Sequence, residues 1–241
     1  MIVIPEKIAL IKVPKAASTT VARMFWEVYG VNRYGRLKSD VATNIRHFMP
    51  LERVGKKIPV LNGNWFLNRS RPFGWHASYA DLSFLFGDQL ADYHWLTSVR
   101  HPVSRLFSVF SFQIAKGRIS ASLCSADFEK FCGMVFSDST LLSHQQVIHT
   151  WPQSFWLPPE NASVRLTILR HERIAEDIRN LAPFVSTFAA ADVGHEGRSF
   201  SGQWREYISP QLQHRIEEFY AEDMHRFGYT PLVAEECGVA K

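Results

Sequence analysis

A short loop near the start of the chain combines the residue types that bind phosphate groups. The largely apolar run of residues 8–13 is followed by Pro14, Lys15, two alanines and three hydroxyl residues. Backbone N–H groups at the start of a helix attract anions, small side chains let the backbone approach the ligand, and a lysine adds positive charge. Residues 14–20 are therefore predicted to form a phosphate-binding cradle.

This loop lacks the glycines that most nucleotide-binding loops contain. A Walker A loop has the pattern G-x-x-x-x-G-K-[ST], whereas residues 7–20 contain no glycine. Lys15 also enters the loop from its beginning, so it would meet a different part of the ligand than a Walker lysine does. The pattern favours a donor other than ATP.

A second group of anion-binding residues follows the strand predicted at His94–Val99. Arg100 stands at the carboxyl end of that strand, and Ser104 and Ser108 lie one helical turn apart in the helix predicted next. Arginine binds phosphate through a bidentate fork, and a serine hydroxyl can complete the oxygen shell. The alternative is that the arginine only caps the structure and the serines only ease helix packing.

His76 has the chemistry of a general base. An imidazole titrates near neutral pH and can accept the proton of a hydroxyl group. The alternative is an ordinary core or surface histidine beside Trp75. Other candidates for the base are Asp81, His47 and His94.

Three strands, each followed by a loop and a helix, must position these residues. The strands are predicted at residues 8–13, 94–99 and 164–169, and the helices at Ser18–Tyr29, at 103–115, at 173–181 and at 210–227, with Gly228 as the stop. This alternation indicates an α/β fold with a central, mostly parallel sheet flanked by helices. In such sheets ligands bind at the carboxyl ends of the strands, where the three loops gather.

The composition is that of a globular protein, and we expect a single domain over residues 1–241. Of these residues 46% are apolar and 21% are charged, which excludes disorder. The net charge of +4 favours an anionic ligand but is too small by itself to indicate nucleic acid.

The cysteine spacing and the hydropathy pattern predict a soluble, cytoplasmic chain. Cys124, Cys132 and Cys237 form no C-x-x-C pair, so neither a zinc site nor a disulfide framework is indicated. A reducing compartment is therefore expected. We expect no signal peptide before the first strand, and no apolar run reaches the ~20 residues that span a bilayer.

Taken together, the two loops resemble the cofactor motifs of sulfotransferases that use 3′-phosphoadenosine 5′-phosphosulfate (PAPS). VPKAASTT matches the first motif, P-K-x-x-x-T, and VRHPVSRLFS matches the second, R-x-P-x-x-R-x-x-S. The resemblance implies a P-loop-like sulfotransferase fold, with Arg100 and Ser108 at the 3′-phosphate and no metal. It also implies that the 5′-phosphosulfate is bound by Lys15, Ala16, Ala17, Ser18, Thr19 and Thr20.

The residues of the first loop are most similar to those of the carbohydrate branch, which includes the heparan sulfate and uronosyl 2-O-sulfotransferases. Their first loop reads P-K-T-A-S-T, and their H-G-H-x-S-Y resembles GWHASY here, with Gly74 replacing the first histidine. The resemblance implies that Lys15 stabilises the leaving phosphate, that His76 is the base and that a sugar hydroxyl is the acceptor.

Acceptor contacts are predicted around His76 and in two loops. Arg69 and Arg71 are candidates for holding a substrate carboxylate, and Trp75 and Tyr79 for further contacts. Acceptor selection is expected in residues 30–71, which are basic, and in residues 117–132. The candidates for sugar-stacking walls are Trp65, Trp75, Trp151 and Trp156. The alternative is that they are buried core residues, as large aromatic side chains usually are.

Two other functions remain open from the sequence. A P-loop-like nucleotide kinase or hydrolase would need Mg²⁺ ligands and an aspartate at the strand end where Arg100 stands. A non-catalytic module that binds anionic glycans would have no need for two phosphate loops with a histidine between them. The sulfated position and the oligomeric state are left open, as is the acceptor among uronic acid, hexosamine, lipid-linked sugar and tyrosine.

Overall fold

The structure, a computed structural model, describes residues 2–4, 8–29, 76, 78–80, 83, 92–137, 144–181 and 204–232. The chain forms two compact units. Unit 1 comprises Met1–Arg100 and Gln153–Gly197, and unit 2 comprises His101–Pro152 and Arg198–Lys241. Each unit is therefore built from two stretches that are separate in the sequence.

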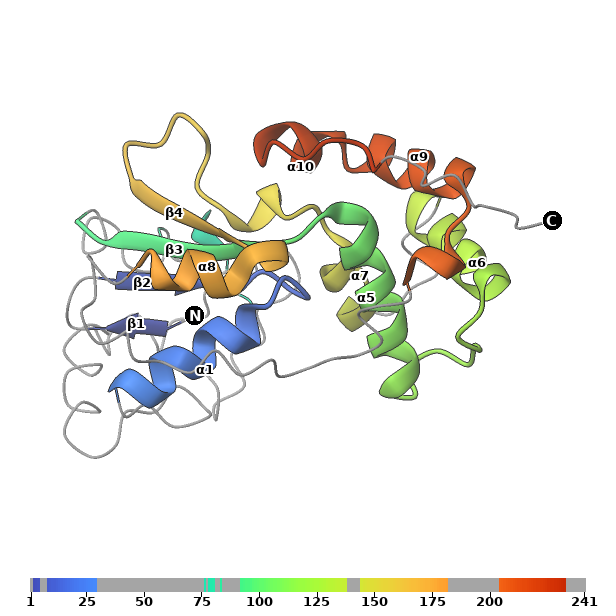
Figure 1. Cartoon of the computed structure of the whole chain (residues 1–241), viewed down its shortest axis with the longest axis horizontal. Coiled ribbons are helices and arrows are strands. Elements are labelled where there is room, and N and C mark those ends of the chain that lie inside the picture. The colour runs from blue at the N-terminus through green and yellow to red at the C-terminus, as the bar shows by residue number, and fades with distance from the viewer. Residues whose placement is uncertain are drawn as a thin grey trace, which may run out of the picture. The chain divides into compact units, whose positions relative to one another are not determined.

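Unit 1 contains a four-stranded sheet of order β1-β2-β3-β4 (Figure 1). β1 (Ile2–Ile4) runs antiparallel to β2 (Ile8–Ile11), while β3 (His94–Val99) and β4 (Arg165–Arg170) continue the sheet in parallel. Ile11 lies opposite Thr97, whose Oγ1 donates a 3.2 Å hydrogen bond to the Ile11 carbonyl. The predicted α/β fold with a mostly parallel sheet is confirmed, and β1 is an additional strand that the sequence did not reveal.

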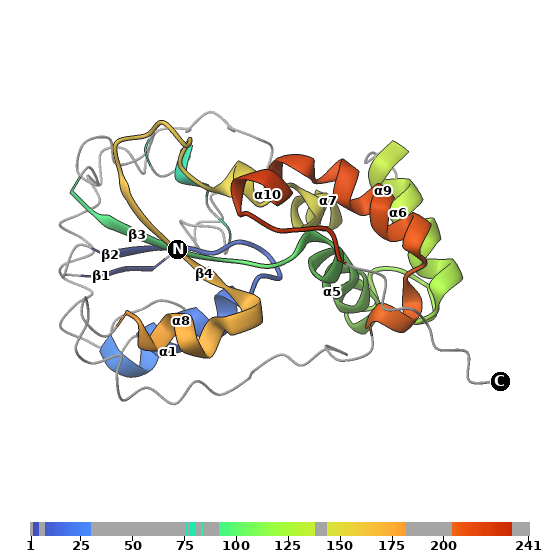
Figure 2. The same cartoon turned by 45° about the horizontal axis from the view of Figure 1, so that its top comes forward.

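The helices α1 (Ser18–Tyr29) and α8 (Ile174–Arg179) cover one face of this sheet (Figures 1 and 2). β2 is buried along its whole length, which explains why it reads as an apolar run without alternation. The core of unit 1 joins residues of both helices to the strands beneath them: Ile8, Leu10, Val21, Ala22, Met24, Leu96, Leu169, Ile174, Ile178 and Leu181.

Unit 2 is helical in its described part. It contains α5 (Pro102–Ala115), α6 (Ser125–Ser137), α7 (His144–Thr150), α9 (Pro210–Phe219) and α10 (Ala221–Arg226). Phe107 and Phe128 pack edge to face, with ring centroids 5.2 Å apart. The core draws on α5, α6 and α9 and comprises Val103, Leu106, Phe107, Val109, Phe110, Phe128, Phe131, Cys132, Val135, Leu212, Ile216 and Tyr220.

The helix predicted at residues 210–227 is two helices. The chain departs from helical geometry at Tyr220, where φ is −104° and ψ is 32°, so α9 ends there and α10 begins at Ala221. Gly228 is the stop, as predicted. Its φ is +59°, and the Tyr229 and Gly228 N–H groups return to the carbonyls of Met224 (2.9 Å) and His225 (3.1 Å), which is a Schellman motif.

Candidate active site

The phosphate loop has an unusual backbone for a segment without glycine. Lys15 and Ala17 both have φ of +62°, whereas Pro14, Ala16 and Ser18 do not have positive φ. Alternation between left-handed and ordinary conformations turns successive N–H groups toward one side, which makes an anion-binding nest. Each non-glycine residue in the left-handed region costs about 1–2 kcal/mol, and strain of this kind gathers at functional sites.

Helix α1 begins directly at this loop. The Val21 N–H bonds to the Ala17 carbonyl at 3.2 Å, so the N–H groups of the preceding residues have no intrahelical acceptor. A helix start of this kind favours an anion. In the loop, Lys15 and Ala17 are half-buried and Thr19 is exposed, while the remaining side chains, Ala16, Ser18 and Thr20, are buried.

Three cationic side chains stand where the parallel strands end. Lys12 directly follows β2, Arg100 directly follows β3, and Arg170 is the last residue of β4. The carboxyl ends of parallel strands share one edge of a sheet, so these cations belong to the same edge as the phosphate loop. Lys12 is only 4% exposed, and burial lowers its pKa to about 8.

The backbone of Arg100 is held by a glutamine that the sequence did not single out. The Arg100 N–H donates to Gln153 Oε1 at 2.8 Å, and Gln153 Nε2 donates to the Arg100 carbonyl, also at 2.8 Å. Gln153 is fully buried. Because 53 positions separate the partners, no local pattern could have indicated the contact.

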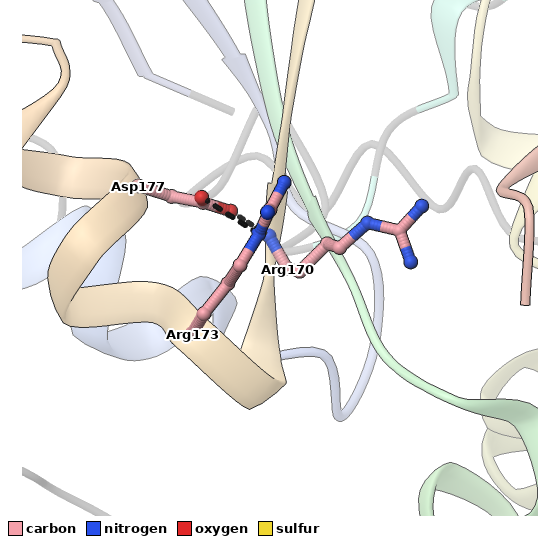
Figure 3. A network of polar contacts seen from close by, with 3 residues as sticks. All are labelled: Arg170, Arg173 and Asp177. Carbon is pink, nitrogen blue, oxygen red and sulfur yellow. Dashed lines mark hydrogen bonds and ion pairs between the residues drawn. The ribbon is translucent and has the colours of Figure 1, made fainter.

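Arg170 is held in a similar way by a carboxylate from the next helix (Figure 3). Its N–H donates to Asp177 Oδ2 at 2.6 Å, and the other oxygen of Asp177 pairs with Arg173 Nε at 3.0 Å. In Figure 3 the guanidinium of Arg170 extends away from Asp177. Asp177 thus anchors the backbone of Arg170 without engaging its guanidinium group.

His76 is tied to the end of β2. Its Nδ1 lies 2.7 Å from the Lys12 carbonyl, and since a carbonyl only accepts, Nδ1 must carry the hydrogen. The neutral ring then has its lone pair on Nε2, the form that can accept a proton. The ring also lies 5.9 Å from that of the buried Trp156, and His76 itself is half-buried.

Of the remaining acceptor candidates, some pack against other residues or lie in the core, and others lie outside the described residues. Tyr79 packs edge to face against Trp95 at 5.1 Å. Trp156 is 1% exposed, so it is a core residue rather than a sugar-stacking wall, whereas Trp151 is half-buried. The predicted loop 117–132 is helical from Ser125 onward, where α6 begins. Outside the described residues lie Arg69, Arg71, Trp65, Trp75, His47, Asp81 and residues 30–71.

His94, an alternative base, lies at the other end of β3 from Arg100. Its Nε2 is 2.7 Å from Thr167 Oγ1 on the neighbouring strand. Burial, followed by the charge of Arg165, lowers the pKa of His94. Since β3 starts at His94 and the cations follow the strand ends, this histidine does not share the cationic edge.

The two serines of the second loop belong to unit 2. Ser104 Oγ donates to the His101 carbonyl at 3.1 Å, and His101 Nδ1 accepts from the Val103 N–H at 3.4 Å, capping α5. Ser108 is buried on α5, and its carbonyl accepts from Ser111 Oγ at 3.3 Å. The contact of Ser104 fits the structural alternative, and a phosphate contact of Ser108 stays a prediction.

In the described ranges no helix is long and apolar enough to cross a membrane. Across those same residues, His, Cys, Asp and Glu side chains do not gather in groups of three or more that could hold a metal ion.

Comparison with known protein families assigns nearly the whole chain to one family. Residues 2–230 match the sulfotransferase family. Neither the curated proteins nor the solved structures gave a match. The matched region contains the glycine-free loop, the cationic strand ends and His76, and it covers nearly all of the sequence. The chain therefore belongs to the sulfotransferase family.

Proposed function

We propose that the protein transfers a sulfuryl group from PAPS to a carbohydrate hydroxyl. The observation that carries the proposal is the edge of the unit 1 sheet, where a nest-forming loop follows β2 and a cationic residue ends or directly follows each parallel strand. A donor with several anionic groups suits such an edge, because cations and oriented N–H groups neutralise its charge.

The donor-binding residues are proposed from the resemblance and from this geometry. The backbone of residues 15–20 surrounds the 5′ side, where the alternating φ values form the nest. Arg100 and Ser108 are the proposed ligands of the 3′-phosphate. Arg100 suits this role because a guanidinium binds phosphate through two parallel hydrogen bonds, and its backbone is held by Gln153.

Lys15 and His76 are proposed to share the chemical step. His76 accepts at Nε2 the proton that the acceptor hydroxyl loses as its oxygen bonds to sulfur. Lys15 donates to the phosphate oxygen that keeps the electron pair of the broken S–O bond. The two groups therefore neutralise charge at opposite ends of an in-line transfer, and the tautomer set by the Lys12 carbonyl leaves Nε2 as the acceptor.

The carbohydrate acceptor is supported by the resemblance of GWHASY to the 2-O-sulfotransferases. Tyr79 follows in that segment, and Arg69, Arg71 and Trp75 stay predicted acceptor contacts. Transfer of labelled sulfate to a panel of acidic polysaccharides, neutral glycosides and tyrosine peptides would identify the acceptor. Transfer to tyrosine peptides alone would contradict the carbohydrate part of the proposal.

A binding test separates this function from the kinase alternative. Adenosine 3′,5′-bisphosphate at 100 times its Kd should stabilise the fold by about 2.7 kcal/mol, which raises Tm by roughly 5–10 °C for a chain of this length. The shift should need no Mg²⁺. Stabilisation by ATP with Mg²⁺, but not by the bisphosphate, would favour a kinase or hydrolase instead.

A transfer test examines the two chemical roles. Lys15→Ala and His76→Ala should each lower kcat at least ~100-fold, since a positioned acid or base typically contributes that much. His76→Ala should keep its affinity for the bisphosphate, because the base meets the acceptor. His94→Ala is the matched control, a histidine at the other end of β3, and should retain near-normal turnover. Normal turnover of His76→Ala would end its assignment as the base.

A further inference from the structure

The side chain of Gln153 behaves as a strand partner for Arg100. Its carboxamide accepts from the Arg100 N–H and donates to the Arg100 carbonyl, both at 2.8 Å. This is the reciprocal exchange that two opposed residues make in an antiparallel ladder. Gln153 is fully buried and Arg100 is 7% exposed, so water has little access to these bonds.

Arg100 needs such a partner because it lies one residue beyond the sheet. β3 ends at Val99, whose register partner on β4 is Arg170. Buried backbone groups must be paired, and Gln153 pairs both groups of Arg100. Holding the N–H and the carbonyl together fixes the peptide planes on either side of the Cα atom, and hence the direction in which the side chain leaves.

The turn that carries Gln153 also reaches the proposed base. Gln153 is the residue before the 3₁₀ helix η3 (Ser154–Trp156). Trp156, at the end of this turn, lies 5.9 Å from the ring of His76 and is itself buried. One short segment of unit 1 thus touches both the arginine of the second loop and the histidine between the loops.

We propose that Gln153 is a positioning residue for donor recognition, acting through Arg100 to place its guanidinium on the 3′-phosphate of the nucleotide. This inference rests on the proposed function. It differs from a purely structural role in one measurable respect. A general loosening of the fold would weaken every nucleotide alike, whereas misplacing Arg100 would weaken only nucleotides that carry a 3′-phosphate.

The test compares two nucleotides that differ in that phosphate. Calorimetry on the full chain gives the Kd of adenosine 3′,5′-bisphosphate and of adenosine 5′-monophosphate, and their ratio measures recognition of the 3′-phosphate. Gln153→Met keeps the shape and removes both hydrogen bonds, and it should shrink the ratio at least about tenfold, the loss expected when a hydrogen bond to a charged group is broken.

Two further variants make the result specific. Arg100→Ala should remove the preference for the bisphosphate, and adding Gln153→Met to it should change the ratio no further, because both act through one contact. Gln113→Met makes the same chemical change at another fully buried glutamine and should leave the ratio as in the wild type. If Gln153→Met does not fold, the same ratio of Kd values is measured for Gln153→Asn, whose side chain is one methylene shorter.

The outcomes distinguish a failure of the proposed donor from a failure of the role proposed for Gln153. A wild-type protein that binds the bisphosphate no better than the monophosphate overturns the proposed donor and the inference with it. A wild-type preference that survives in Gln153→Met, or in Gln153→Asn where that variant is used, overturns the inference alone. A reduced ratio with unchanged affinity for the monophosphate supports it.

Discussion

The phosphate loop holds its shape against the preference of its residues. Ala17 has φ of +62°, where an alanine side chain is strained, while the neighbouring Ala16 does not have positive φ and is fully buried. Ala17→Gly should therefore raise the free energy of unfolding by about 1 kcal/mol, because glycine adopts the left-handed region without strain. Urea denaturation followed by circular dichroism measures the change.

Ala16→Gly is the matched control for that substitution. The same atoms are removed one position away, where φ is not positive, so only the added freedom of the unfolded chain and a small loss of packing remain. We expect a decrease of about 1 kcal/mol. Equal effects of the two substitutions would show that Ala17 carries no strain.

Lys12 makes the stability of the protein depend on pH. Burial lowers its pKa from 10.5 to about 8 in the folded chain, so between these pH values the unfolded chain holds more protons. The free energy of unfolding then rises with pH across this window. Lys12→Met lacks this rise. The free energy of unfolding of the variant, relative to that of the wild type, should therefore fall by about 3 kcal/mol between pH 7.5 and pH 10.5.

Chemical denaturation of both proteins at several pH values checks this prediction. A constant difference between wild type and Lys12→Met from pH 7.5 to 10.5 would show that the ammonium is not desolvated in the folded chain.

At this scale the sequence revealed residue types better than conformations. Lys15, Arg100 and His76 could be singled out because lysine, arginine and imidazole carry recognisable chemistry. The positive φ values of Lys15 and Ala17 could not be predicted from the sequence, since neither residue type favours that conformation. The bond from His76 to the Lys12 carbonyl joins residues 64 positions apart, so it depends on the fold rather than on a motif.

Among the helices, the end of α7 is held by an arginine from α5. Arg105 is 1% exposed and donates to the carbonyls of His149 (3.1 Å) and Trp151 (2.6 Å). The Tyr220 hydroxyl donates to the carbonyl between them, that of Thr150. Three successive carbonyls at a helix end, which have no partner within the helix, are therefore satisfied by two side chains.

Arg105→Lys should lower the free energy of unfolding by about 2–4 kcal/mol. A lysine keeps the charge but lacks the fork that reaches two carbonyls at once, and a buried hydrogen bond to a charged group contributes about 1.5–3 kcal/mol. The control is Arg118→Lys, an exposed arginine stacked 5.4 Å from Phe112, which should cost less than ~0.5 kcal/mol. Equal costs in thermal or chemical denaturation would contradict the role of Arg105.

The elements that follow simple rules were predictable. α1 and β3 have the predicted bounds because each is a continuous periodic or apolar segment with a clear start. The break at Tyr220 was missed because the apolar spacing continues through it, and the Tyr220 side chain itself packs into the core of unit 2. β1 was missed because three residues are too short to show a period.

At the scale of the molecule, neither unit is a continuous piece of chain. Unit 2 takes α5 and α6 from His101–Pro152 but α9 from the C-terminal stretch, and Leu212, Ile216 and Tyr220 of that stretch lie in its core. A chain ending at Gly197 should therefore lose the cooperative unfolding of unit 2 and bind hydrophobic dyes. Thermal unfolding followed by circular dichroism and the fluorescence of an added hydrophobic dye would test this, and a truncated chain that still unfolds cooperatively and binds no dye would contradict it.

The parallel pairing of β3 with β4 has a consequence for biosynthesis. β3 ends at Val99 and β4 begins at Arg165, so the ribosome adds 65 residues between them, which takes roughly 3–13 s at 5–20 residues per second. During that time the buried, apolar strand β3 has one edge without its partner, and such edges template aggregation. The yield of folded protein should thus depend on chaperones that cover this edge until β4 has been made.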